Sequence, residues 1–193
     1  MKFKYISYPK REQRLPEILY IQEIQLLFDK ITNIKHKSIA VLLYSCGLRV
    51  SEIINLKTNN IDSKRMMIQV VQAKGNKDRY VPLSQSVLEM LRRYYRVYKP
   101  GVFLFKGQLK DQYSAKSIQT FLKYYAKLAG IKKHVHPHQL RHCFAVHHLE
   151  QGTDLRYIQE FLGHKNSKTT ERYTHVSNLN LNLIKSPIEA IKL

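Results

Sequence analysis

A short β-prone segment interrupts a chain whose apolar residues otherwise follow helical spacing, and this contrast restricts the possible folds most. Residues 60–82, NIDSKRMMIQVVQAKGNKDRYVP, combine β-branched runs with turn residues at Asp62-Ser63 and Gly75-Asn76. Two or three antiparallel strands joined by these turns account for the pattern. The sequence therefore predicts a mainly α-helical fold with a small antiparallel β-sheet.

Helices are predicted on both sides of this segment. Apolar residues from Ile21 to Ile31 follow amphipathic spacing, and a more uniformly apolar stretch from His36 ends at Gly47, where a left-handed cap is expected. No internal repeat or long linker divides the chain, so one domain is expected. Further helices are predicted over residues 84–98, 114–129, 137–150 and 154–162, with Thr153 as a candidate cap of the last, and shorter ones after Ser51 and Ser167.

Positive charge is concentrated in the middle of the sequence. The formal net charge is +19, and residues 64–133 contribute +13 of it, with 16 Lys and Arg against three Asp and Glu. Solvated protein faces usually carry both signs of charge. A nearly acid-free stretch therefore favours a phosphate backbone as partner over a purely solubilising role.

Several classes of protein are disfavoured by what the sequence lacks. It has neither a run of about 18 uncharged apolar residues for a membrane span nor a secretory signal, so we expect a cytoplasmic protein. Cys46 and Cys143 are the only cysteines, and both are expected to be buried thiols. Phosphate-loop, dinucleotide and zinc motifs do not occur, and the spacing of His134, His136 and His138 with Cys143 does not suit zinc. We expect no metal and no cofactor.

Arginine and histidine side chains near predicted helix ends are the main candidates for chemistry. His138 and Arg141 lie three residues apart in HQLRH, so a helix projects both from one face. His142 is the next residue and need not point with them. Arg49 lies at the junction of two predicted helices, where Glu52 can hold its guanidinium. Any one of these residues, taken alone, is more often structural than functional.

The order of the motifs is more informative than any single residue. GLRVSE, AKGNKDRYVPL, HQLRH, LGH and ERYTH follow one another along the chain. Together they resemble the catalytic domain of tyrosine recombinases, the phage integrase and Xer-type family, over Leu15 to Val176. The resemblance implies that family's DNA breaking-rejoining enzyme fold. It also implies one shared catalytic site, which here consists of Arg49, Lys74, His138, Arg141, His164 and Tyr173.

These side chains suit attack on a phosphodiester. Arg49 and Arg141 offer fixed bidentate donors to the non-bridging oxygens, where negative charge grows in the transition state. Tyr173 would be the nucleophile and form a covalent phosphotyrosine. Its hydroxyl, with a free pKa of about 10, must lose a proton, and His138 is the better-placed candidate base. By resemblance, Lys74 is the candidate acid for the leaving 5′ oxygen.

Other residues are expected to contact the DNA or to support the site. By resemblance, His164 donates a hydrogen bond to the scissile phosphate. Lys77 and Arg79, in the same hairpin as Lys74, are interpreted as DNA backbone contacts, and the acid role for one of them stays open as an alternative. Glu52 is expected to give structural support. The predicted DNA-contact set is Lys77, Arg79, Arg92, Arg93, Arg96, Lys116 and Lys123.

The resemblance also suggests an organisation of the chain. We expect residues 1–193 to form a single catalytic domain, with a leader (1–14), a core (15–176) and a tail (177–193), and without the N-terminal core-binding domain of full recombinases. The apolar tail packs either on its own domain or on a neighbouring subunit. Double-stranded DNA and other recombinase subunits are the expected partners, with a monomer in solution, a tetramer in the full synapse, and a nucleoid location in the cytoplasm.

The expected function is site-specific DNA recombination, in integration, excision or resolution, through a 3′-phosphotyrosine intermediate. Two alternatives remain open at this point. The first is a type IB topoisomerase-like activity, which would relax supercoils without site preference. The second is a non-catalytic basic DNA-binding module, which would bind DNA in a salt-sensitive way without any covalent intermediate.

Overall fold

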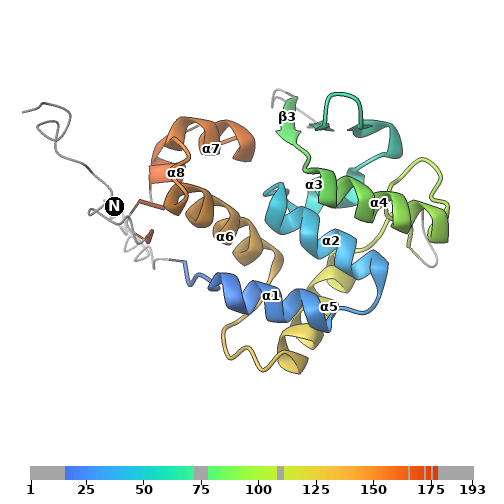
Figure 1. Cartoon of the computed structure of the whole chain (residues 1–193), viewed down its shortest axis with the longest axis horizontal. Coiled ribbons are helices and arrows are strands. Elements are labelled where there is room, and N and C mark those ends of the chain that lie inside the picture. The colour runs from blue at the N-terminus through green and yellow to red at the C-terminus, as the bar shows by residue number, and fades with distance from the viewer. Residues whose placement is uncertain are drawn as a thin grey trace, which may run out of the picture.

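Helices make up most of the structure, a computed structural model that describes residues 16–71, 78–107, 111–164, 166–171, 173–174 and 176–177 (Figure 1). The prediction of a mainly helical fold with a small antiparallel sheet is confirmed. The elements, in chain order, are α1 (Ile21–Lys30), α2 (Ile34–Ser45), α3 (Val50–Asn55), the 3-10 helix η1 (Thr58–Asn60), β1 (Ile61–Asp62), β2 (Met67–Val70), β3 (Arg79–Pro82), α4 (Gln85–Tyr98), α5 (Ala115–Leu128), α6 (Pro137–Glu150), α7 (Leu155–Leu162) and α8 (Lys168–Glu171).

Helix α2 lies at the centre and packs against α3, α4, α5 and α6. It begins at Asn33, whose side chain accepts hydrogen bonds from the backbone N–H groups of Lys35 and His36. This cap satisfies donors that the first turn of a helix leaves unpaired. Ile39 and Leu43 are among its completely buried residues. A helix buried on several sides needs no continuous polar face, which agrees with the apolar run from Ile39 to Leu43.

Gly47 ends the α2 segment in the left-handed conformation that the sequence predicted, with φ at +57°. The space around it is as restrictive as its backbone. A Cβ atom at this position would lie 2.7 Å from Cδ1 of Phe144 and 3.0 Å from Cδ2 of Leu162. Glycine therefore allows the turn after α2 to pack closely against α6 and α7.

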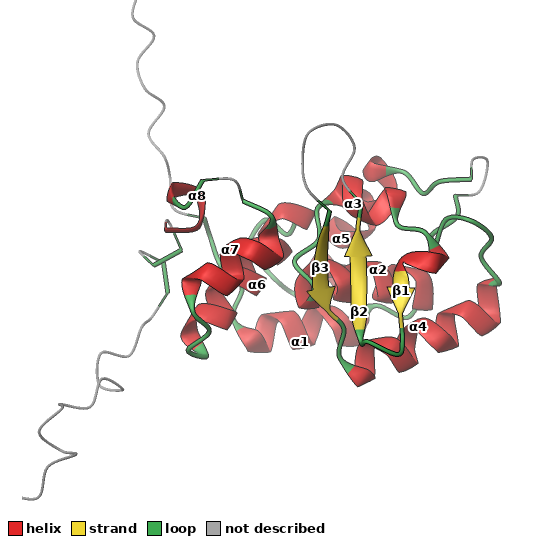
Figure 2. Cartoon of the chain, turned by 90° about the horizontal axis from the view of Figure 1, so that it is seen from above, coloured by secondary structure: helices red, strands yellow, loops and turns green. Residues whose placement is uncertain are grey.

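The three strands form an antiparallel sheet in the order β1-β2-β3 (Figure 2). Ile68 pairs with Val81 and Val70 pairs with Arg79. These four residues are buried, whereas their neighbours along each strand are more exposed. Successive side chains of a strand point to opposite faces, so Arg79 lies on the core face of β3. The turn predicted at Gly75-Asn76 falls outside the described residues.

Helices α6 and α7 share a second apolar cluster next to the central core. Phe144 on α6 and Ile158 and Leu162 on α7 belong to it, and so does Tyr173. Helix α6 has the predicted bounds and begins with Pro137 at its first position, where a missing N–H is harmless. The predicted tyrosine nucleophile is thereby packed against the helix that carries the HQLRH motif.

The structure also tests the predictions for the cap of α7 and for the two cysteines. The cap of α7 is Asp154, whose carboxylate accepts from the backbone N–H of Arg156, so the assignment of that role to Thr153 was wrong. Cys46 and Cys143 are free and buried, as predicted. Among the described helices, none combines the length and hydrophobicity that a membrane crossing requires.

Candidate active site

Glu52, on the short helix α3, is the carboxylate at the centre of the site. Its Oε1 lies 2.9 Å from Nη1 of Arg49 and 2.8 Å from Nη1 of Arg79. Its Oε2 lies 2.8 Å from Nη2 of Arg79 and 3.8 Å from Nη1 of Arg141. One buried carboxylate therefore contacts three guanidiniums that come from the start of α3, from β3 and from α6.

These contacts determine the protonation of Glu52. Burial alone would raise the pKa of its carboxyl, but the hydrogen bonds and positive charge of Arg79, the backbone N–H of Arg49 and the charge of Arg141 lower that pKa to about 2. The carboxylate is therefore ionised at neutral pH. The cluster of Arg49, Glu52, Arg79 and Arg141 has three positive charges and one negative charge.

Arg141 is nearly inaccessible and is held at both ends of its guanidinium. Nη1 donates to the backbone carbonyl of Gly47, at the end of α2, and Nη2 donates to that of Leu162, at the end of α7. Carbonyl groups at helix C-termini carry partial negative charge and favour cations. Burial and the charge of Arg49 lower the pKa of Arg141 to about 9, which still leaves the guanidinium protonated at neutral pH.

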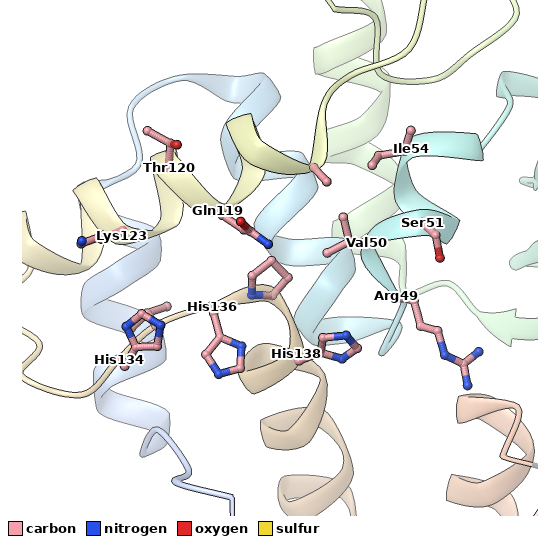
Figure 3. Close-up of a pocket in the computed structure, with 13 residues that line it drawn as sticks. Arg49, Val50, Ser51, Ile54, Gln119, Thr120, Lys123, His134, His136 and His138 are labelled. Carbon is pink, nitrogen blue, oxygen red and sulfur yellow. The ribbon is translucent and has the colours of Figure 1, made fainter.

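Arg49 lines an open groove of about 750 Å³ beside this cluster (Figure 3). Its side chain is 30% exposed, so it is the accessible member of the arginine pair. His138, at the start of α6, lies beside it, and Lys123 on α5 lines the groove further along. The groove thus contains two of the predicted catalytic residues and one predicted DNA contact. The other lining residues are Val50, Ser51, Ile54, Ala115, Gln119, Thr120, His134, Val135, His136 and Pro137.

His164 follows the left-handed Gly163 that ends α7, and two contacts orient its ring. Nε2 lies 3.3 Å from Nη2 of Arg141, and Nδ1 lies 3.0 Å from the hydroxyl of Thr170. A guanidinium can only donate. In this arrangement Nε2 is therefore the acceptor, and Nδ1 carries the proton that it donates to Thr170, which is fully buried.

The hydroxyl of Tyr173 meets a histidine other than the one the sequence favoured. It lies 2.9 Å from Nδ1 of His142, and the Tyr173 side chain is almost completely buried. We predicted His138 as the base and left the direction of His142 open. A signal was available, because His138 and His142 are four residues apart and such residues share a helix face. The structure adds His142 to the site.

The structure gives Arg79 a role different from the predicted DNA backbone contact. Its side chain is 6% exposed, both terminal nitrogens bind Glu52, and Nε donates to the carbonyl of Phe161 at 2.7 Å. At 6% exposure the guanidinium lies below the surface, where a DNA phosphate along the strand does not reach it. We therefore correct its assignment to support of the site. Lys74 and Lys77 lie outside the described residues.

The remaining predicted DNA contacts lie in different places. The arginines of α4, namely Arg92, Arg93 and Arg96, are all exposed, but α4 packs on α2 and lies on the other side of the domain from α3 (Figure 2). The structure thus separates them from the groove beside Arg49. Lys116 is exposed in the first turn of α5, and it lines a separate pocket with His36 and Tyr124.

Metal ligation was also tested against the geometry. Within the ranges that the structure describes, no three His, Cys, Asp or Glu side chains are placed to hold a metal ion. The rings of His134 and His136 have centroids 5.3 Å apart, but Cys143 is buried in the core and accepts from the backbone N–H of Leu19. These side chains do not form one ligand set.

Comparisons with known proteins agree with the motif order and with the fold. Tyrosine recombinase XerA of Pyrococcus horikoshii is 40% identical over 96% of this chain and 65% of the relative. Tyrosine recombinase XerC of Staphylococcus epidermidis is 37% identical over 93% of this chain and 64% of the relative. A crystal structure of XerA recombinase aligns with a TM-score of 0.78 and 33% identity, over 89% of this chain and 63% of that chain.

The chain spans less than two thirds of the length of each of these relatives. They nevertheless match most of this chain. The phage integrase family profile matches residues 17–179, from just before α1 to just beyond Tyr173. The chain therefore belongs to the phage integrase family and contains its tyrosine recombinase catalytic domain.

Proposed function

We propose that this chain cleaves and rejoins DNA strands through Tyr173, as the catalytic domain of a site-specific recombinase. The observation that carries the proposal is the placement of a tyrosine hydroxyl against an imidazole beside a buried guanidinium cluster. Structures of XerH recombinase with its difH substrate and of the Tn1549 transposon integrase with transposon DNA share the fold. Double-stranded DNA is accordingly the proposed substrate.

In the proposed reaction the Tyr173 oxygen attacks the scissile phosphorus. A bond forms between this oxygen and phosphorus, and the bond between phosphorus and the 5′ oxygen breaks, which leaves a 3′-phosphotyrosine. The phenolic proton passes to Nδ1 of His142, which is within hydrogen-bond distance. Because Tyr173 is 1% exposed, the attack requires Tyr173 to move from its present position. Rejoining is the reverse transfer to a 5′ hydroxyl.

The guanidiniums stabilise the charge that grows on the non-bridging oxygens. Arg49 is accessible from the groove and can donate to the phosphate directly. Arg141 contributes positive charge from a fixed position behind it. Donors that are fixed before the reaction need no reorganisation in the transition state, which makes them more effective than water.

Three further groups complete the proposed reaction. His164 donates from Nε2 to a phosphate oxygen, so its proton must shift from Nδ1 when phosphate replaces the contact with Arg141. The hydroxyl of Thr170 both donates and accepts, so it can partner Nδ1 in either state. Lys74 is proposed as the acid that protonates the leaving 5′ oxygen. His138, on the groove wall, is proposed as a further phosphate contact.

The proposed biological setting follows from the same family membership. The protein would act on DNA in the cytoplasm, associated with the nucleoid, as a monomer in solution and within a tetramer of recombinase subunits in the synapse. Residues 1–193 would form one catalytic domain, and the apolar residues of the tail, 177–193, would pack either on this domain or on a neighbouring subunit.

A suicide substrate tests the proposal directly. A DNA duplex with a nick just beyond the cleavage site loses its 5′ product, so the covalent adduct accumulates. The wild type should form an adduct that is stable in detergent, whereas Tyr173→Phe should form none and keep its DNA affinity within about twofold, because the substitution removes one oxygen from a buried side chain. An adduct in the Tyr173→Phe variant would refute Tyr173 as nucleophile.

A plasmid relaxation assay, together with the adduct assay, separates the two alternative functions. A topoisomerase of the IB type would relax supercoiled plasmid without site preference. A non-catalytic binding module would bind the duplex and yield no adduct with any candidate site.

A further inference from the structure

Arg79 is a buried charge, bound to Glu52 and to the carbonyl of Phe161, that the proposed reaction does not use directly. We propose that Arg79 is a positioning residue for this reaction: it binds both oxygens of Glu52 and so limits the contacts of this carboxylate with Arg49 and Arg141. Arg49 can then turn its remaining donors toward the scissile phosphate, and Arg141 keeps its position behind it. The inference rests on the proposed function. It concerns a residue on β3 that is not among those lining the groove.

The geometry of the Arg79–Glu52 pair is bidentate. Nη1 lies 2.8 Å from Oε1 and Nη2 lies 2.8 Å from Oε2, and both side chains are 6% exposed. The third donor, Nε, is used by the carbonyl of Phe161 near the end of α7. A planar guanidinium can make these three bonds at once, whereas a lysine ammonium cannot reproduce the fork. The pair therefore fixes the orientation of the carboxylate.

The charge of the cluster shows why this orientation matters. Three guanidiniums and one carboxylate leave a net charge of +2 beside the groove. Without Arg79 the net charge would be +1, and Glu52 would be free to bind Arg49 and Arg141 through both oxygens. The catalytic guanidiniums would then be turned toward a carboxylate that also repels the phosphate. Arg79 prevents this by holding the carboxylate on the core side.

Arg79 also joins three elements that carry other parts of the site. It belongs to β3, it binds Glu52 on α3, and it binds the end of α7, which leads into His164. The strand β3 follows directly after the segment that contains Lys74 in the sequence. One side chain thus connects the arginine that lines the groove, the His164 segment and the strand next to the proposed acid.

A double substitution distinguishes a positioning role from a purely structural one. Arg79→Met removes one positive charge, and Glu52→Gln removes the negative charge that Arg79 controls. The double variant restores the net +2 of Arg49 and Arg141 without restoring the buried ion pair. If Arg79 acts by controlling Glu52, the double variant recovers function. If Arg79 only stabilises the fold, the double variant should be at least as impaired in cleavage as the two single variants combined.

Single-turnover cleavage of the nicked duplex, at saturating enzyme, provides the first measurement. Loss of one preorganised donor commonly costs about 100- to 1000-fold in rate, so Arg79→Met should lose about 100-fold. Arg79→Met/Glu52→Gln should be at least tenfold faster than Arg79→Met. Arg79→Lys should fall between the wild type and Arg79→Met. DNA affinity should stay within about threefold throughout, because Arg79 is not on the surface.

A matched control removes another ion pair away from the site. Lys133 binds Glu23 at 2.6 Å, and the two side chains are 21% and 23% exposed. Lys133→Met should lower the urea midpoint and leave the cleavage rate of the folded protein within about twofold. Circular dichroism and urea unfolding of every variant identify the temperatures at which all are folded, and rates are compared there.

Binding of inorganic phosphate, followed by ³¹P NMR, tests the inference without cleavage. The wild type should bind phosphate, Arg79→Met should bind it at least tenfold more weakly, and the double variant should recover most of the affinity. A wild type that forms no adduct would refute the proposed function. The ranking of the three proteins by phosphate affinity would still decide the role of Arg79. A double variant no better than Arg79→Met in rate and in phosphate affinity, or a wild type that binds no phosphate, would overturn the inference.

Discussion

The hydroxyl of Tyr173 lies 2.9 Å from Nδ1 of His142, so the proposed nucleophile is paired with the second histidine of HQLRH and not with the first. His138, the first histidine, lies on the wall of the groove with Arg49. In the proposed reaction the two imidazoles of this helix therefore have different tasks. We propose that His142 takes the phenolic proton and that His138 contacts the phosphate.

The first prediction concerns this division of tasks. His142→Phe should lower the rate of adduct formation about 100-fold, the lower end of what a positioned base contributes, and should leave DNA affinity nearly unchanged. His134→Phe is the matched control, because His134 also lines the groove but does not contact Tyr173. It should keep at least half of the wild-type rate. Equal rates for the wild type and His142→Phe would return the base role to His138.

The second prediction concerns the orientation of His164. Thr170→Val removes the hydroxyl that contacts Nδ1 of the half-buried His164 ring, and the loss of such a hydrogen bond costs about 1–3 kcal/mol. We expect cleavage to slow about tenfold. Thr170→Ser keeps the hydroxyl and should cleave at close to the wild-type rate. Single-turnover rates of the two variants provide the measurement, and equal rates would contradict the prediction.

The third prediction concerns the turn after α2. Gly47→Ala should lower the free energy of unfolding by about 3 kcal/mol, since a Cβ in the left-handed conformation is strained and this one also clashes with Phe144. Gly130→Ala is the control, because Gly130 has φ at +70° but no atom within 4 Å of a Cβ. It should cost about 1 kcal/mol. Urea unfolding measures both, and equal losses would show that packing at Gly47 is unimportant.

The fourth prediction concerns acid stability. The pKa of Glu52 is about 2 in the folded protein, and about 4.3 is expected in the unfolded chain. A depressed carboxyl pKa stabilises the fold above the unfolded value, and this stability is lost as the pH falls from about 4.5 toward 2. The shift corresponds to about 3 kcal/mol. Urea unfolding should show this loss in the wild type, and the slope should be smaller in Glu52→Gln.

The fifth prediction concerns DNA binding. Lys123 lines the groove with Arg49. In a plot of the logarithm of DNA affinity against the logarithm of salt concentration, Lys123→Gln should make the slope less negative by about 0.9, the value for one lost phosphate contact. Arg93→Gln should leave this slope unchanged, because Arg93 lies on α4. Fluorescence anisotropy at several salt concentrations measures both. The opposite order would place the DNA on α4.

Local sequence signals were sufficient for most of the fold. Helix α6 has the predicted bounds and Gly47 has the predicted conformation, because capping, glycine and spacing act within a few residues. The catalytic set was inferred from motif order. The structure brings Arg49 and Arg141 to one carboxylate and packs Tyr173 beside α6.

Tertiary pairing was harder to predict. Arg79 was read as a DNA contact because it lies in a basic run, yet its partner Glu52 is 27 residues away. A local signal did exist: Arg79 is two residues before the buried Val81 on a strand, so it shares the core face. The separation of α4 from the groove had no such signal, since charge along a sequence does not indicate which side of a domain it occupies.

Arg141 links the last carbonyl groups of two helices, that of Gly47 after α2 and that of Leu162 in α7. An anion that binds more tightly when Arg141 holds both carbonyl groups also stabilises the docking of α7 on the rest of the domain. By thermodynamic linkage, the docking of α7 in turn strengthens the binding of that anion. Bound DNA should therefore protect the amide protons at the end of α7 from hydrogen exchange more than those of α1. Bound substrate would therefore stabilise α7, the helix that precedes His164.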